Sequence, residues 1–418
     1  MCVAVSAALV VACSTATEPA PETVSSTPTA SAALKSVDPA ALQAAVSQAA
    51  VQMRVPGVVV RVRTPEGTVD AAVGTTELGT GFEPDVGTHV RIASNTKTFT
   101  SALIVLLVQD GLLAFDDAVS EYVPDVPNGE NITIAQLLDM RSGLYNYTEA
   151  PELAATMDAD PAKVWTPQEV LGIAFAHPPN FPPGAEYEYD NTNYALLGLV
   201  AEKVGGRPLA DQFDERLFGP LGLDETSLPA ADDASIPHPR SHGYMYGESK
   251  YALVDEPYPP DLTAAALAGT LAPHDYTHQN PSYATAAGGA ISTTDDLATW
   301  IEALVEGRVF GADMQRQWDD SRKVEDPAAP DGQQYGYGIS YQRFGPGAAM
   351  YYHGGELPGF NSFIGHDADN DVTVVIWTNL TLSPDGATTA NALLPTVLGQ
   401  VYEDSALGSP APTVTPTR

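Results

Sequence analysis

The sequence predicts a mixed α/β (α+β) fold, in which strands from both ends of the chain form one antiparallel sheet around an inserted, mainly helical lobe. Two valine-rich runs near the start, 58–63 and 68–73, flank the turn Thr64-Pro65-Glu66-Gly67 and predict a β-hairpin. Four runs near the other end predict successive antiparallel strands: 337–343, 348–353, 360–366 and 371–379. A last helix is expected over 388–402. The stretch between the two strand groups is mainly helical, with long Pro- and Gly-rich loops such as 238–275.

The ends of the chain differ in composition from its body. Residues 1–13 contain a short apolar run that ends in Val10-Val11-Ala12-Cys13, which resembles a bacterial lipoprotein signal with Cys13 as the lipidated residue. No Lys or Arg precedes the run, so a start inside a longer signal or a buried N-terminal helix are alternatives. We expect a disordered Ser/Thr/Pro-rich tether over 14–36, a catalytic domain over 37–405 and a disordered tail over 406–418.

The formal net charge of −34 narrows the possible partners. Such a surface repels nucleic acid and anionic lipid, so neither is an expected partner, and membrane contact is expected only through the lipid anchor. The negatively charged surface also repels a substrate carboxylate at long range. A second interpretation of the acidity is solubility outside the cell. The two cysteines, Cys2 and Cys13, both lie in the N-terminal stretch, so 37–405 has no disulfide and no thiol nucleophile.

Ser94 and Lys97 form the single Ser-x-x-Lys of the chain, at the start of a predicted buried helix. Apolar residues recur after it at helical spacing, and Gly111 is a plausible C-cap. A serine hydroxyl is a poor nucleophile until a neighbouring group takes its proton, and a desolvated lysine can do so. The alternative is that Ser94 is only an N-cap.

Two further motifs follow in order along the chain, Tyr189-Asp190-Asn191 and His353-Gly354-Gly355. Ser-x-x-Lys, then Tyr-x-Asn, then His-x-Gly resembles the active-site serine penicillin-recognising enzymes. The variant is similar to the branch that holds the D-alanyl-D-alanine carboxypeptidases, class C β-lactamases and related esterases. The resemblance runs from about residue 41 to residue 403. It implies the fold that the strand pattern also predicts, with one sheet from both ends of the chain and an inserted helical lobe.

The resemblance implies a role for each motif residue. Ser94 is the nucleophile, and its backbone N–H and that of Glu356 stabilise the oxyanion. Tyr189 is the proton shuttle, with a pKa lowered by the Lys97 ammonium. Asn191 holds the substrate amide and orients Lys97. Asp190 departs from the family pattern, in which a small residue is usual, and the sequence leaves its orientation open.

The third motif and its surroundings are expected to bind substrate. His353 supplies a donor, and a positive charge when it is protonated. Gly354 and Gly355 allow a substrate backbone to approach, although a strand bend explains glycine equally well. Arg343 is a candidate cation for a substrate carboxylate. Aromatic residues that could line the cleft, or pack in the core, are Tyr145, Tyr147, Trp300 and Phe360. No metal and no cofactor are expected.

The sequence therefore predicts an envelope serine hydrolase that acts through a Ser94 acyl-enzyme, most simply a D-Ala-D-Ala carboxypeptidase-like peptidase. Its substrate would be a peptidoglycan stem peptide, a β-lactam or an ester. A class C-like β-lactamase or an esterase shares the first step, and a catalytically silent binding module shares the fold. The expected location is the outer face of a bacterial plasma membrane, lipid-anchored or released.

Overall fold

The computed structural model describes residues 33–254 and 256–403. The chain divides into two units, 1–30 and 31–418, and every described residue belongs to the second. The predicted signal with Cys13, the tail over 406–418 and most of the predicted tether lie outside the described residues. At the tether's described end, Leu34 forms a bridge with Tyr402, so ordered backbone begins before residue 37. No helix among the described residues is long and apolar enough to cross a membrane.

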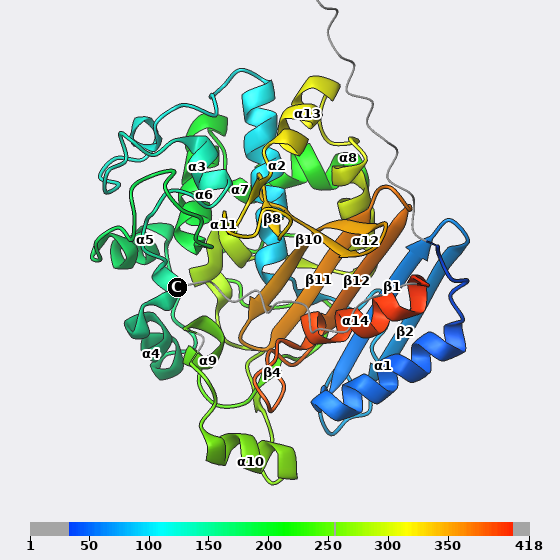
Figure 1. Cartoon of the computed structure of the whole chain (residues 1–418). Coiled ribbons are helices and arrows are strands. Elements are labelled where there is room, and N and C mark those ends of the chain that lie inside the picture. Colours follow the sequence, from blue (N-terminus) through cyan, green and yellow to red (C-terminus); the bar gives the residue numbers. More distant parts are fainter. Residues whose placement is uncertain (1–32, 255, 404–418) are drawn as a thin grey trace, which may run out of the picture. The chain divides into compact units, whose positions relative to one another are not determined.

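An eight-stranded antiparallel sheet forms the centre of the described region, in the order β2-β1-β12-β11-β10-β9-β8-β7. Its strands are β1 (Gly57–Thr64), β2 (Gly67–Gly74), β7 (Lys323–Val324), β8 (Gln334–Tyr335), β9 (Ser340–Gly345), β10 (Ala348–Leu357), β11 (Phe360–Asp367) and β12 (Val372–Thr378). The N-terminal hairpin joins the C-terminal strands where Val58 of β1 pairs with Thr378 of β12. This confirms the predicted sheet built from both ends of the chain (Figure 1).

Helices cover both faces of this sheet. On one face lie α1 (Pro39–Met53) and α14 (Thr389–Val401), blue and red in Figure 1. Val58, Val60 and Val62 point into the apolar core beneath them. The intervening Val59 belongs to a second core, on the side of α12 (Thr294–Val305) and the helical lobe. Because both faces of β1 are buried, the strand is a continuous valine run rather than an alternating one.

The helical lobe is inserted between β2 and β7, as predicted, and its central helix is α2 (Thr96–Gln109). The other principal helices of the insertion are α3 (Ile134–Leu138), α4 (Pro151–Ala159), α5 (Pro167–Phe175), α6 (Asn191–Gly205), α7 (Leu209–Phe213), α8 (Gly219–Leu221), α9 (Lys250–Leu253), α10 (Pro260–Ala268), α11 (Thr285–Gly288) and α13 (Ala312–Asp320). Two pairs of two-residue strands complete it: β3 (Val90–Arg91) with β6 (Ile291–Ser292), and β4 (Tyr244–Met245) with β5 (His274–Asp275). Helices α9 and α10 lie inside the predicted loop 238–275, so that prediction was wrong for these residues.

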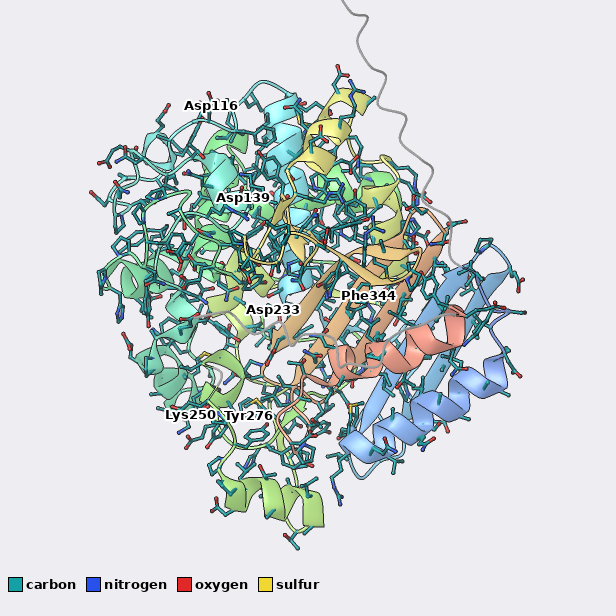
Figure 2. The ribbon with its side chains drawn as sticks, in the orientation of Figure 1. Asp116, Asp139, Asp233, Lys250, Tyr276 and Phe344 are labelled. Carbon is teal, nitrogen blue, oxygen red and sulfur yellow. The ribbon has the colours of Figure 1, made fainter. Side chains whose placement is uncertain are left out.

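An ion pair between a buried carboxylate and an exposed lysine joins the lobe to the edge of the sheet. Asp139, labelled in Figure 2, is buried just after α3, and its Oδ2 accepts a hydrogen bond from Lys323 Nζ on β7 at 2.7 Å. Phe344 on β9, also labelled there, packs edge-on against Tyr352 of β10 at 5.6 Å between ring centroids. The strand predicted over 337–343 begins instead at Ser340, because Gly338 adopts a left-handed turn with φ of 74°.

Candidate active site

Ser94 lies in a 3₁₀ turn, Ala93–Asn95, that runs directly into α2. The first residue of the turn, Ala93, is left-handed with φ of 51°, which is an unfavourable conformation for a residue with a side chain. Asn95, not Ser94, occupies the N-cap position of α2, so the N-cap interpretation of Ser94 was wrong. The Ser94 side chain is partly exposed and lines a cleft between the lobe and β10.

Lys97 is fully buried beneath Ser94, one helical turn later. Its Nζ lies 3.0 Å from Ser94 Oγ, and it donates to Asn191 Oδ1 at 2.6 Å and to the Ala287 carbonyl at 2.8 Å. The last two groups can only accept, so they take two N–H bonds of Lys97. A neutral amine then has its lone pair left for the Ser94 hydroxyl proton. The geometry therefore fits Lys97 as the base that activates Ser94.

The orientation of Asn191 follows from a chain of hydrogen bonds that sequence reasoning missed. Asn146 Nδ2 donates to Glu149 Oε1 at 3.2 Å, which turns Asn146 Oδ1 toward the Thr148 hydroxyl at 2.9 Å. Thr148 Oγ1 has then used its proton, so it accepts from Asn191 Nδ2 at 2.9 Å. Asn191 Oδ1 is left facing Lys97, as the family resemblance implied. The only signal in the sequence was the position of 146–149 beside the predicted cleft aromatics.

The protonation of Lys97 is set by burial and opposed by Asp190. Desolvation lowers the Lys97 pKa well below its ordinary value, and the negative charge of Asp190 acts in the opposite direction. Asp190 is buried at the N-cap of α6, where Oδ1 accepts from the Thr192 backbone N–H at 2.7 Å. Its Oδ2 is buried without a hydrogen bond. This inward position settles the orientation that the sequence left open.

Tyr189 lies beside both catalytic candidates. Its hydroxyl is hydrogen-bonded to Ser94, and Lys97 Nζ lies 4.9 Å from the centre of its ring. Burial raises the pKa of Tyr189, so the expectation of a lowered pKa was wrong. The reason is that Lys97 is itself desolvated and supplies too little positive charge to stabilise a phenolate. Tyr189 remains a phenol, which suits it to hand a proton to a leaving group.

The His353-Gly354-Gly355 segment forms the opposite wall on β10. Strand β9 pairs with β10 only as far as Ser340 opposite Tyr352. The edge of β10 from 353 to 357 therefore extends beyond its described partner strand and lines the cleft. An extended substrate backbone can pair with such an edge, as in β-strand addition. The backbone of Glu356 lies on this edge, as the expected oxyanion role of its N–H requires.

The two glycines differ in what surrounds them. A Cβ on Gly355 would lie 2.2 Å from the Ile92 carbonyl oxygen and 2.4 Å from Ser362 Oγ. A Cβ on Gly354 would meet nothing closer than Asn391, at 3.6 Å. Gly355 is therefore needed for the close packing of β10 on the turn that carries Ser94, whereas a Cβ on Gly354 would make only ordinary van der Waals contacts.

His353 is neutral, so the expected positive charge was wrong. Burial and the neighbouring Lys97 lower the His353 pKa to about 3. Its Nδ1 lies 2.6 Å from the Gly354 carbonyl, which can only accept, so Nδ1 carries the proton. Nε2 then accepts from the Tyr335 hydroxyl at 3.1 Å. Both ring nitrogens are occupied by protein groups, and the imidazole positions the wall of the cleft.

Arg343 does not contribute to the site. It is exposed on β9 and is not among the described residues that line the cleft, because β9 has left the cleft by that position. Of the four aromatic candidates, Tyr147 lines the cleft and the others do not. Trp300 stacks on Phe99 in the core at 4.3 Å, and Phe360 is buried there too. Tyr145 stacks on His177 at 4.0 Å.

The described lining of the cleft carries negative charge only. Glu149 and Glu356 line it, and no Lys or Arg is among its described lining residues. Lys97 is buried beneath Ser94 and is not among the described residues that line the cleft. A substrate carboxylate would thus lie near two acidic residues and a neutral histidine, whereas the two acids would attract an ammonium group.

Comparison with known proteins gives consistent matches. The β-lactamase family model matches residues 42–397. A D-aminopeptidase of Cereibacter sphaeroides is 28% identical over 323 residues, or 75% of this chain and 54% of the relative. The chain thus spans about half the length of such curated relatives.

Solved structures match over nearly their full length. A D-stereospecific amidohydrolase from Streptomyces sp. is 29% identical, with a TM-score of 0.72 over 89% of this chain and 99% of that one. The D-amino acid amidase from Ochrobactrum anthropi SV3, solved with L-phenylalanine amide, is 27% identical, with a TM-score of 0.71 over 86% and 97%.

Proposed function

The chain belongs to the β-lactamase family of serine hydrolases, and we propose that it hydrolyses amides or short peptides whose reacting residue has a free α-amino group. The observation that carries the proposal is the charge of the cleft, whose described lining includes Glu149 and Glu356 but no Lys or Arg. The matches to a D-aminopeptidase and a D-amino acid amidase support this substrate class and a D configuration at the reacting residue. The net charge of −34 also attracts a cationic substrate.

The reaction follows from the contacts of Ser94. Its Oγ attacks the substrate carbonyl while the neutral Lys97 amine takes the hydroxyl proton. The backbone N–H groups of Ser94 and Glu356 stabilise the oxyanion, and the positive end of α2 assists. The C–N bond then breaks, and the amine leaves with a proton delivered through Tyr189, which leaves an ester on Ser94. Water attacks this ester, and the acid is released with Ser94 restored.

The carboxylate of Glu149 is the proposed partner of the substrate ammonium. It is partly buried at the cleft wall, and Asn146 holds it by the hydrogen bond that begins the chain to Lys97. A charged hydrogen bond of this kind contributes about 1.5–3 kcal/mol. The D-Ala-D-Ala carboxypeptidase alternative requires a cation for the terminal carboxylate, and the cleft offers none among its described lining residues.

A substrate panel tests the proposal. D-alanine p-nitroanilide should be hydrolysed with a higher kcat/KM than its N-acetyl derivative, and than a blocked peptide that ends in D-Ala-D-Ala. Ser94→Ala should abolish turnover of all three. Glu149→Gln should lower kcat/KM on the free amine by roughly tenfold to a hundredfold, and leave the N-acetyl substrate unaffected.

Glu152→Gln is the matched control, because Glu152 is an exposed acid three residues away that does not line the cleft. Faster hydrolysis of the blocked D-Ala-D-Ala peptide would favour the carboxypeptidase instead. Dominant turnover of nitrocefin or of p-nitrophenyl esters would favour a β-lactamase or an esterase. If no substrate is turned over and no covalent label attaches to Ser94, the remaining explanation is a catalytically silent binding module.

We also infer that the protein is held at the outer face of a bacterial plasma membrane through Cys13. The support is the Val10-Val11-Ala12-Cys13 pattern followed by a Ser/Thr/Pro-rich stretch. Substrates at that location would be short peptides and amides outside the cytoplasm.

A further inference from the structure

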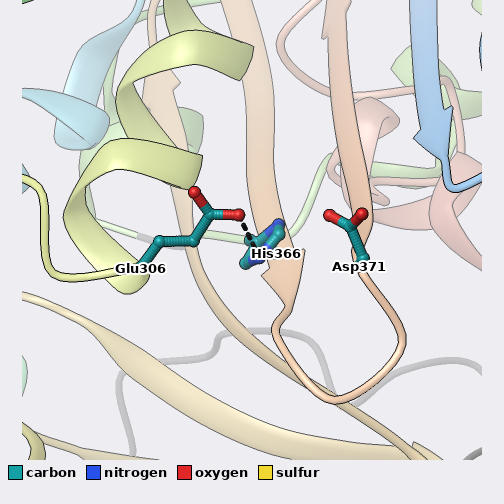
Figure 3. Close-up of side chains that lie close together, drawn as sticks. All are labelled: Glu306, His366 and Asp371. Atoms are coloured by element: carbon teal, nitrogen blue, oxygen red, sulfur yellow. Dashed lines mark ion pairs between the residues drawn. The ribbon is translucent and has the colours of Figure 1, made fainter.

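Three side chains capable of binding a metal meet at one end of the central sheet, away from the cleft. Glu306 follows the last turn of α12, His366 lies on β11, and Asp371 directly precedes β12. Their potential ligand atoms all lie within 4.8 Å of one another, and the imidazole stands between the two carboxylates (Figure 3). The cluster could not be predicted from the sequence, because Glu306 is far from the other two residues along the chain.

The hydrogen bonds around His366 determine which ring nitrogen carries its proton. Thr373 Oγ1 donates its proton to Glu302 Oε1 at 2.8 Å. The same Oγ1 lies 2.9 Å from His366 Nδ1 and therefore accepts from it. The proton is on Nδ1, and the lone pair of Nε2 faces the cluster. Fixing the outer nitrogen of a histidine in this way is the usual arrangement around a metal-binding imidazole.

The inner nitrogen of His366, Nε2, faces the carboxylate of Glu306 as an ion-pair contact (Figure 3). The side chain is 1% exposed, and the carboxylate oxygen facing Nε2, Glu306 Oε1, is 3.9 Å away, too far for a hydrogen bond. A buried lone pair that faces two carboxylates is an electrostatic arrangement that a cation would stabilise.

The exposed side chains of Glu306 and Asp371 can rotate toward a shared cation. Both Glu306 and Asp371 are exposed. Arg308 Nη2 contacts Glu306 Oε2 at 3.1 Å, which leaves Oε1 on the side of His366. In a tetrahedral zinc site with ligands at about 2.0–2.2 Å, neighbouring ligand atoms lie roughly 3.4 Å apart. The 3.9 Å between Nε2 and Oε1 is therefore within reach of a small side-chain rotation.

We propose that Glu306, His366 and Asp371 bind a zinc ion that ties the end of α12 to the β11–β12 turn, with water completing the coordination. An imidazole among the ligands favours zinc over calcium or magnesium, which prefer all-oxygen sites. Ser362, which bonds Asn95 beside the nucleophile, lies on the same strand as His366 but roughly 13 Å along it. The ion would therefore stabilise β11 without touching the reacting groups.

Zinc binding by the full chain tests the proposal. After chelator treatment and dialysis, ZnCl₂ should bind at one site in the wild type and raise its Tm by a few degrees. Asp371→Asn, Glu306→Gln and His366→Asn should each weaken zinc binding at least tenfold and reduce the increase in Tm. Asparagine is tolerated at Asp371, whose φ is 52°, and at 366 its amide can still donate to Thr373. If His366→Asn folds poorly, the variants at the two exposed ligands, Asp371→Asn and Glu306→Gln, still test the proposal.

Asp369→Asn is the matched control, since it removes one exposed charge from the same turn. It should bind zinc like the wild type. Equal zinc affinity in the wild type, Asp371→Asn and Glu306→Gln would overturn the proposal, as would no zinc binding by the wild type. A preference for calcium at equal concentration would overturn the assignment to zinc.

Discussion

At the scale of single residues, the buried position of Lys97 determines the chemistry. The sequence motifs were sufficient to predict that Ser94, Lys97, Tyr189 and Asn191 meet, and the structure brings all four together. Their protonation could not be predicted, because desolvation depends on what the fold packs around each group. The expectation of a charged His353 was wrong for this reason. Burial lowers its pKa to about 3, and this burial cannot be predicted from the local sequence.

We predict that Asp190→Asn shifts the acidic limb of the pH profile of kcat/KM to lower pH. The Asp190 carboxylate stabilises the Lys97 ammonium and so raises the Lys97 pKa. Removing that charge lowers the pKa further, so the neutral amine persists at lower pH. Asparagine also caps a helix, so α6 should keep its start. The measurement is kcat/KM against pH on one free-amine substrate.

Glu186→Gln, at an exposed acid four residues earlier, is the control and should leave the profile in place. An unchanged profile in Asp190→Asn would show that Asp190 carries a proton in the active enzyme. Its strongly raised pKa, caused by burial, makes this a real test of the electrostatic role.

At the scale of elements, the contact between β10 and the nucleophile turn fixes the width of the cleft. The paired glycines were predicted to let substrate approach, yet only Gly354 has room for a side-chain atom. Gly355 instead lets two protein segments pack closely, and the sequence could not distinguish the two because both glycines lie in extended backbone. Tyr335, which orients His353, comes from a two-residue strand that has no periodic signal to detect.

We predict that Gly355→Ala is destabilising and Gly354→Ala is not. The new Cβ at 355 would force β10 away from Ile92 and Ser362, a form of overpacking that costs about 1–3 kcal/mol. The same shift would move the Glu356 N–H relative to Ser94, so kcat should fall as well. The measurements are Tm and steady-state kinetics of both variants. Similar losses in the two variants would contradict the packing argument.

At the scale of the whole molecule, the division into a sheet from both ends and an inserted lobe was predictable from the sequence. Helix α1 was missed, although Asp38 and Pro39 form an N-terminal signal and Leu42, Val46 and Ala50 recur every fourth residue. Its composition, rich in alanine, blends into the Ser/Ala-rich stretch before it. The cluster of Glu306, His366 and Asp371 could not be predicted, since it depends on the register of β11 against β12.

We predict that Cys13→Ser moves the whole protein from the detergent phase to the aqueous phase in a phase-partition assay. The reason is that two acyl chains on a lipidated cysteine would be its attachment to the membrane, while the net charge of −34 opposes any other contact with anionic lipid. Cys2→Ser is the control and should still partition into detergent. A mature N-terminus upstream of Cys13 would contradict the prediction.

The pairing of β1 with β12 has a consequence for synthesis. Val58 leaves the ribosome long before Thr378, its partner, and at about 5–20 residues per second the interval is roughly 15–60 s. Throughout that time the valine faces of the first hairpin lack the strand that covers their edge. The nascent chain must therefore keep this hairpin from pairing with other chains, and a transcript cut short before β12 encodes a product that cannot close its sheet.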